Sequence, residues 1–282
     1  MKLGRPGAEI WVPDGTSVED ALSRTTHMGV GAHADDVEIL AQRGILDCFN
    51  RRDRWFTAAV VTDGAGSARS GPYAEYTDTD MRAIRRLEQK KAAMVGDYAA
   101  VVQLDYTSPE VKTAPASAAV SDLAALLAAA RPEILYTHNL TDKHDTHVAT
   151  ALRVVEACRR LPESQRPARV LGGEVWRALD WLCDPDKVAI DVQDRESLTT
   201  ALLGVFDSQV TGGKRYDLAT HGRHRANATY LESHHLDASI ALTFAMDLTP
   251  LVQDASLDPQ AYAVAFVERF RQEVAERLRR LV

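Results

Sequence analysis

The fold of this chain is decided by the stretch His27-Met28-Gly29-Val30-Gly31-Ala32-His33-Ala34-Asp35-Asp36. Its first six residues are mostly apolar or glycine and predict a buried strand. From Val37 to Phe49 the apolar residues recur at roughly helical spacing, so a helix is expected next. The segment from His33 to Asp36 therefore lies in a loop that joins a buried strand to a helix.

The same strand-then-helix unit recurs along the first half of the chain. Further strands are expected at 56–61, 100–104 and 133–137, and helices at 80–95, 116–130 and 144–160. Such alternation predicts an α/β fold of the Rossmann-like, doubly wound type, with a mostly parallel sheet and helices on both faces.

A smaller mixed α/β extension is expected beyond a polar linker at 161–167. It contains strands near 169–176, 188–192 and 241–246, and helices near 195–205, 214–230 and 259–281. We expect one domain over 1–282, with its core at about 26–160 and the extension at about 168–282.

Composition excludes several classes of protein. Hydrophobic residues make up 45% of the chain and charged residues 26%, which is typical of a globular domain. The net charge of -7 argues against nucleic acid as a partner. Cys48, Cys158 and Cys183 show no CxxC spacing, which favours a reducing compartment. No apolar run is long enough to span a bilayer and the N-terminus lacks a signal-peptide core, so we expect a cytoplasmic protein without a membrane partner.

Polar side chains follow the first and fourth expected strands. His33, Asp35 and Asp36 follow the first, and His144 and His147 follow the fourth. In open α/β sheets ligands bind at the carboxyl ends of the strands, where both loops lie. Two histidines three residues apart at a helix start share one face.

These residue types suit metal-assisted hydrolysis. A catalytic zinc takes three nitrogen or oxygen ligands and leaves one position for water. A free carboxylate then takes the proton of that water, and a donor group stabilises the oxyanion. Taken alone, the Asp pair is more typical of a helix cap and the HxxH pair of surface histidines. Their occurrence together at one sheet edge favours a metal site.

The motifs resemble the PIG-L/LmbE-like family of zinc-dependent N-deacetylases. The first family signature, Ala-His-Pro-Asp-Asp, is matched by Ala32-His33-Ala34-Asp35-Asp36, and the second resembles the run from Thr137 to His147. Segments at 60–64, 85–88 and 208–209 are also similar. The resemblance implies an LmbE-like fold and activity on N-acetylglucosamine-type sugars, glycosides or thiol precursors.

The resemblance also implies the roles of the loop residues. His33, Asp36 and His147 match the metal ligands for one Zn²⁺ per chain, with other divalent metals left open. Asp35 matches the general base, and His144 matches the residue that stabilises the oxyanion and protonates the amine.

Two departures from the family pattern stand out. Ala34 replaces a proline, which should be tolerated. Thr146 replaces an aspartate that is expected to orient a histidine. Asp142 or Asp145 are the alternatives that would take over this role.

Substrate contacts are expected from Arg85, Asp105 and Asn139. The alternatives are a solvated helix residue for Arg85 and a loop-holding amide for Asn139. His138 is either a pocket residue or a strand-end histidine, and the second interpretation is favoured. The donor-rich segment Gly222–Asn227 is interpreted either as a grip on a sugar or anion, or as a surface turn.

The sequence thus predicts a hydrolase that removes an N-acetyl or other N-acyl group from an amino sugar or related small glycoside. Two alternatives stay open. Two histidines and one aspartate also describe non-haem iron enzymes, and Thr146 leaves room for a non-catalytic, sugar-binding member of the family. A homo-oligomer is compatible with the sequence.

Overall fold

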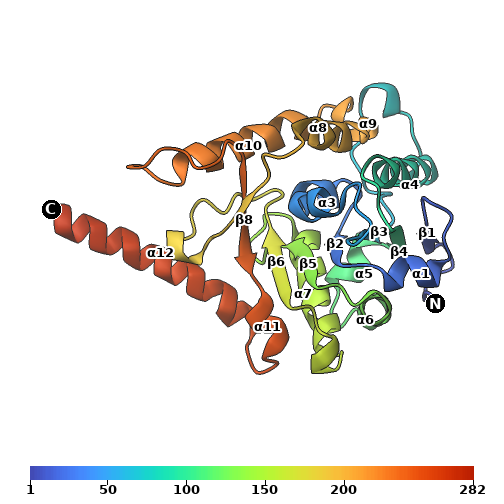
Figure 1. Ribbon diagram of the computed structural model, residues 1–282, viewed down its shortest axis with the longest axis horizontal. Coiled ribbons are helices and arrows are strands. Elements are labelled where there is room, and N and C mark those ends of the chain that lie inside the picture. Colours follow the sequence, from blue (N-terminus) through green and yellow to red (C-terminus); the bar gives the residue numbers. More distant parts are fainter.

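The computed structural model describes residues 1–282, which build one eight-stranded sheet with helices on both faces (Figure 1). The strands, in sheet order, are β1 (Glu9–Trp11), β4 (Ala100–Tyr106), β3 (Phe56–Thr62), β2 (His27–Gly31), β5 (Ile134–His138), β6 (Arg169–Gly173), β8 (Leu242–Asp247) and β7 (Val188–Asp191). Strands β4, β3, β2, β5 and β6 pair in parallel, whereas β1 and β8 pair with their neighbours in antiparallel fashion. The expected mostly parallel α/β sheet is confirmed.

The strand order creates a switch point between β2 and β5. The chain runs from β2 outward to β3 and β4, then returns to place β5 and β6 on the other side of β2. Strands β2 and β5 are direct neighbours, with Met28 opposite Leu135. Open α/β sheets bind ligands outside the carboxyl ends of such strands.

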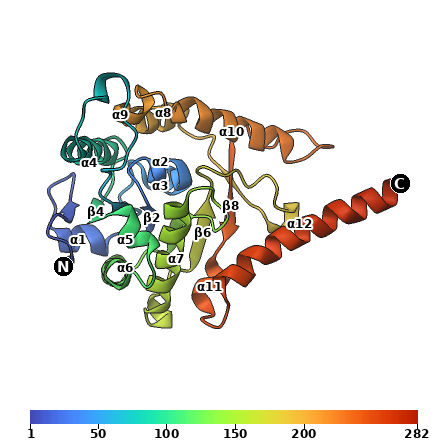
Figure 2. The ribbon, with the colours of Figure 1, turned by 180° about the vertical axis from the view of Figure 1, so that it is seen from behind.

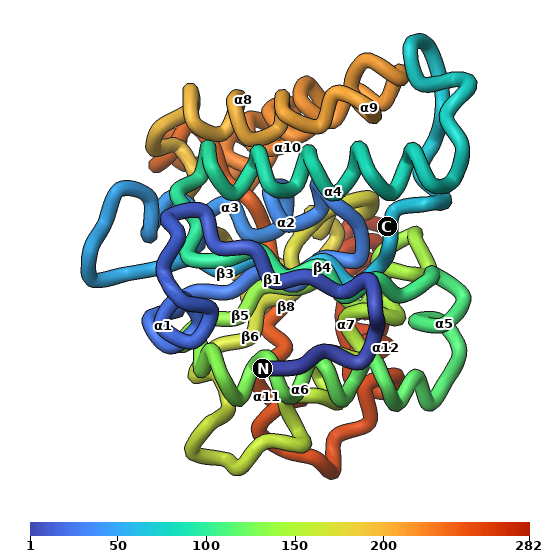
Figure 3. Tube along the Cα trace, turned by 90° about the vertical axis from the view of Figure 1, so that its right-hand side faces the viewer, coloured from blue at the N-terminus to red at the C-terminus, as the bar shows by residue number.

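The helices form a layer on each face of the sheet (Figure 3). One layer contains α1 (Val18–Ser23), α5 (Ser108–Lys112), α6 (Ser117–Ala130), α7 (Asp145–Arg159), α11 (Thr249–Gln253) and α12 (Pro259–Leu281). The other contains α2 (Asp36–Leu40), α3 (Gln42–Cys48), α4 (Asp78–Val95), α8 (Glu196–Gly204), α9 (Asp207–Val210) and α10 (Tyr216–Tyr230). Three short 3-10 helices, η1 (Gly71–Tyr73), η2 (Glu163–Gln165) and η3 (Asp184–Asp186), lie in the connections.

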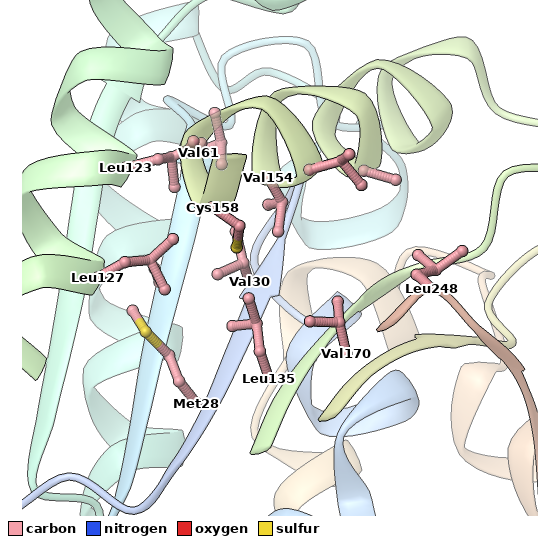
Figure 4. Close-up of a cluster of buried hydrophobic side chains, with 14 of the residues drawn as sticks. Met28, Val30, Val61, Leu123, Leu127, Leu135, Val154, Cys158, Val170 and Leu248 are labelled. Carbon is pink, nitrogen blue, oxygen red and sulfur yellow. The ribbon is translucent and has the colours of Figure 1, made fainter. Parts of the chain in front are cut away.

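Side-chain alternation along the strands supplies a separate core for each layer. On β3, Ala59 and Val61 pack into the core beneath α6 and α7, whereas Ala58 packs into the core beneath α2 and α3. Figure 4 shows the first core, in which Met28 and Leu127 come from the sheet and α6. Both cores pack the parallel strands against helices. The ends of the strands are therefore fixed in position, and the loops that follow them begin at fixed points.

Several elements differ from the sequence expectations. The helix expected after Asp36 is divided into α2 and α3 at Ala41, whose backbone leaves the helical region with φ -115 and ψ 20. Strand β1 was not expected, because three residues are too few to show alternation. Helices α5, α9 and α11 were also not expected, and each has five residues or fewer.

The C-terminal helix α12 leaves the body of the molecule (Figures 1 and 2). Its first half is anchored by buried Phe266 and by Tyr262, whose hydroxyl donates to the Asp247 carbonyl at 2.7 Å. Its last turns carry exposed Leu278 and Leu281. None of the helices has the length and apolar character that crossing a membrane requires.

Candidate functional site

The loops after β2 and β5 bring His33, Asp36 and His147 together. His33 Nδ1 lies 3.1 Å from His147 Nε2 and 3.3 Å from Asp36 Oδ2. His147 Nε2 lies 3.4 Å from Asp36 Oδ1. Asp36 opens α2, and His147 lies in the first turn of α7, so both positions follow directly from the two neighbouring strands.

These separations suit a metal ion. Ligands about 2.1 Å from a tetrahedral zinc are about 3.4 Å from one another, so the three atoms have the spacing of a ligand set. Two further histidines extend the cluster. His144 forms a metal-capable group with His33 and His147, and His138 forms another with Asp36 and His147. Imidazole and carboxylate donors are those that zinc and related divalent metals prefer.

The protonation states also suit a metal. Burial tends to raise the pKa of Asp36, but the His147 and His138 imidazoles hold it well below its usual value. Burial lowers the pKa of His147 to about 4. A metal ligand must be a carboxylate or a neutral imidazole, and both residues are in that form near neutral pH.

His138 belongs to this cluster, although the sequence analysis interpreted it as a strand-end residue. Its Nε2 accepts the Ala32 backbone N–H at 2.9 Å and lies 3.3 Å from Asp36 Oδ2. Its ring stacks on His147 with centroids 3.9 Å apart. The position at the end of β5, which neighbours β2, is the signal that would have found it.

Asp142 stands behind His147. Its Oδ1 lies 3.6 Å from His147 Nδ1 and accepts the His144 N–H at 3.0 Å. A carboxylate at Nδ1 favours the tautomer that leaves Nε2 free for a metal. Thr146 is buried and its N–H donates to His144 Nδ1 at 3.2 Å, whereas Asp145 is exposed. Of the two aspartates considered as replacements at Thr146, only Asp142 has this position.

Asp35 faces the cleft from a strained backbone. Its φ of 89° is uncommon for a residue with a side chain and is a feature of functional sites. Arg85 Nη2 donates to Asp35 Oδ2 at 2.6 Å and also to the Ala34 carbonyl. Burial raises the pKa of Asp35 to about 6, although Arg85 acts in the opposite direction.

His144 caps the start of α7 and lines the cleft. Its Nδ1 accepts a backbone N–H, so the ring proton lies on Nε2. The ring stacks on that of His147 with centroids 4.6 Å apart. His144 therefore presents a hydrogen-bond donor, Nε2–H, beside the cluster.

The three expected substrate contacts have different surroundings. Arg85 lines the cleft, but its guanidinium is buried between Asp35 and Glu88. Asp105 is not among the lining residues and pairs with Arg86 at 2.5 Å. Asn139 is fully buried, and its amide donates to the Gly173 carbonyl at 2.9 Å.

The cluster opens into a cleft of about 300 Å³. One wall is the loop from Gly64 to Ala68, which Gln209 holds by donating to the Ala68 carbonyl. A second wall contains Trp176, Lys214 and Tyr216. These three residues come from the extension and carry no motif, so spacing in the sequence does not place them at the cleft.

The donor-rich segment Gly222–Asn227 lies within α10 and braces this wall. Arg223 donates to the Val175 carbonyl at 2.7 Å, and Asn227 donates to buried Glu174 at 2.8 Å. The surface-turn interpretation is therefore wrong, because the segment is helical.

Comparisons with known proteins agree with this arrangement. A family model described as PIG-L, GlcNAc-PI de-N-acetylase, matches residues 28–158, which confirms the resemblance over the segment that holds the cluster. No curated protein sequence matches the chain.

Solved structures share the fold at low sequence identity. The 4-carboxy-2-hydroxymuconate hydratase GalB of Pseudomonas putida has a TM-score of 0.58 and 16% identity, over 79% of this chain and 96% of that one. The N,N'-diacetylchitobiose deacetylase of Pyrococcus horikoshii has a TM-score of 0.59 and 14% identity, over 78% and 83%. The A40926 pseudoaglycone deacetylase Dbv21 has a TM-score of 0.57 and 16% identity, over 79% and 97%.

Proposed function

We propose that this chain, which matches the PIG-L family over residues 28–158, is a metal-dependent hydrolase that removes an N-acetyl or other N-acyl group from an amino sugar or related small glycoside. The observation that carries the proposal is the convergence of His33, Asp36 and His147 beside a buried Asp35 that pairs with Arg85. Hydrolysis of an amide needs both a metal-capable cluster and a separate base.

His33, Asp36 and His147 would hold the metal, with Zn²⁺ the best fit to the donor set. When bound, a divalent metal acts as a Lewis acid that polarises the acyl carbonyl and acidifies water. Asp142 holds the ring of His147 in the orientation that presents Nε2 to the cluster.

Asp35 takes the proton of the attacking water as the new C–O bond forms. Arg85 fixes the Asp35 carboxylate for this task, because it donates to both the side chain and the preceding carbonyl. His144 donates from Nε2 to the developing oxyanion. The proton that Asp35 has taken from water is then delivered to the nitrogen as the C–N bond breaks, so Asp35 returns to its carboxylate form. The products are a free amine and a carboxylate.

The fold alone does not select this reaction, because GalB is named a hydratase. The residues favour amide hydrolysis, since Asp35 supplies a base and His144 a hydrogen-bond donor, and both line the cleft with His33 and Asp36. The position of Asp142, whose Oδ1 lies 3.6 Å from His147 Nδ1, favours a catalytic over a non-catalytic protein despite Thr146.

The test is reconstitution of chelator-treated protein with Zn²⁺, or with Fe²⁺ under anaerobic conditions. Acetate release from N-acetylglucosaminyl compounds is measured together with oxygen uptake. We expect acetate release to return with about one equivalent of Zn²⁺ per chain and no oxygen uptake. The proposal fails if fully loaded protein releases no acetate from any N-acetylated sugar, or if Fe²⁺ supports oxygen uptake instead.

A further inference from the structure

One wall of the cleft comes entirely from the C-terminal part of the chain. Trp176 follows β6, and Lys214 and Tyr216 stand at the start of α10, all beyond the segment that matches the family model. The Trp176 and Tyr216 rings meet edge to face, with centroids 5.9 Å apart. Lys214 Nζ lies 5.0 Å from the centre of the Trp176 ring.

Lys214 is the cation of the cleft that no carboxylate neutralises. Arg85, the other lining cation, is held by Asp35 at 2.6 Å and by Glu88 at 2.8 Å. Lys214 has no carboxylate within salt-bridge distance, and its side chain is exposed beside an aromatic face. An ammonium group in this position is available to an anion.

Hydrogen bonds hold the backbone at Trp176 in place. Asp142 Oδ2 accepts the backbone N–H of Trp176 at 3.0 Å, and Arg223 donates to the carbonyl of Val175 at 2.7 Å. The Trp176 backbone is thereby linked through Asp142 to His147, while 38% of the Trp176 surface stays exposed. Burial raises the pKa of Tyr216, so its hydroxyl keeps its proton and can donate near neutral pH.

We propose that Trp176, Lys214 and Tyr216 form a subsite for a sugar that carries an anionic group, either a phosphate or a carboxylate. The apolar face of the ring packs on Trp176, because aromatic rings combine a large apolar face with low conformational cost. Lys214 pairs with the anion, and Tyr216 donates a hydrogen bond. The inference rests on the proposed function in one respect: the acylated amine of the sugar is placed at His33, Asp36 and His147.

The test compares binding by calorimetry with and without Zn²⁺, using N-acetylglucosamine, N-acetylglucosamine 1-phosphate and N-acetylmuramic acid. We expect at least one anionic sugar to bind about tenfold tighter than the neutral one, which corresponds to about 1.4 kcal/mol. Lys214→Met should remove this preference and leave the neutral sugar unchanged. Trp176→Ala should weaken all three by roughly tenfold. Lys91→Met, which removes an exposed lysine from α4, is the matched control.

The outcomes separate the subsite from the proposed function. The subsite stands and the function fails if the anions bind in a Lys214-dependent manner, also without metal, but no acetate is released. The subsite is refuted if Lys214→Met and Lys91→Met bind every sugar as the parent protein does. A preference for only the phosphate or only the carboxylate identifies the anion and supports the subsite.

Discussion

Replacement of Arg85 by methionine tests the buried charge network beside the cluster. Arg85 is 3% exposed, and its guanidinium donates to Asp35, Glu88 and Ser208. Methionine keeps most of the volume of the side chain but removes every donor. The buried carboxylates of Asp35 and Glu88 then lose the cation that they share.

The expected loss is large. Removal of one partner from a buried ion pair costs about 3–5 kcal/mol, because the remaining charge is uncompensated. Ser208 limits the loss, since its N–H and hydroxyl still donate to Glu88 at 2.6 and 2.8 Å. Asp35 has no comparable substitute donor. We therefore expect the free energy of unfolding to fall by about 3–4 kcal/mol, or roughly 6–15 °C in Tm for a domain of this size.

Urea and thermal unfolding of chelator-treated protein measure this loss without any contribution from a metal. Arg82→Met is the matched control, because Arg82 lies one turn earlier on α4 and pairs with Asp63 while 41% exposed. Because the Arg82 side chain is open to solvent, this pair should contribute much less than the buried one, about 1 kcal/mol. If Arg85→Met and Arg82→Met destabilise the protein equally, the buried network does not exist as described.

Three further perturbations have definite outcomes. Asp142→Asn should weaken Zn²⁺ binding by about 10–100-fold in a chelator competition, because His147 loses its orienting carboxylate. His224 is a pH-dependent element: burial lowers its pKa from 6.5 to about 3, so the unfolded chain binds a proton that the fold excludes. Stability should therefore fall as the pH drops below 6.5, by up to about 1.4 kcal/mol per unit, and His224→Gln should remove that part of the slope in urea unfolding. Gly31→Ala should abolish metal binding in the same competition, because the added Cβ would lie 2.8 Å from Asp36 Cβ.

Each of these has its own control. Asp145→Asn is the control for Asp142→Asn, because Asp145 is an exposed neighbour. If the two variants bind Zn²⁺ with equal affinity, Asp142 does not orient His147. His221→Gln changes a partly exposed histidine on the same helix as His224, and an identical slope in both variants would contradict the pH argument. Gly66→Ala adds a Cβ that meets nothing within 4 Å, so its metal binding should match the parent protein.

The parallel half of the fold is predictable because its strands are buried on both faces. Residues 56–62 and 100–104 are all buried, and such continuous apolar runs are visible in a sequence. The break at Ala41 is not visible, since the apolar spacing continues through it. Strand β1 exists only because β4 offers a free edge, which is a tertiary property.

The candidate site also contains residues that the sequence predicts and residues that only tertiary contacts reveal. His33, Asp36 and His147 stand in short motifs at strand ends, so spacing alone places them on one sheet edge. His138 and Asp142 act through contacts across strands and loops, which spacing does not contain. Asp105 shows the converse, because a strand-end position predicted a pocket contact and the side chain instead pairs with Arg86.

The division of labour between Asp35 and the metal cluster is tested most directly by Asp35→Asn. Asparagine tolerates the positive φ at this position, so the loop should keep its shape. Metal content and acetate release are measured on the same samples of parent and variant protein. We expect the variant to hold the same amount of Zn²⁺ and to lose at least about 100-fold in rate, because the base is gone. Full activity in metal-loaded Asp35→Asn would contradict the account.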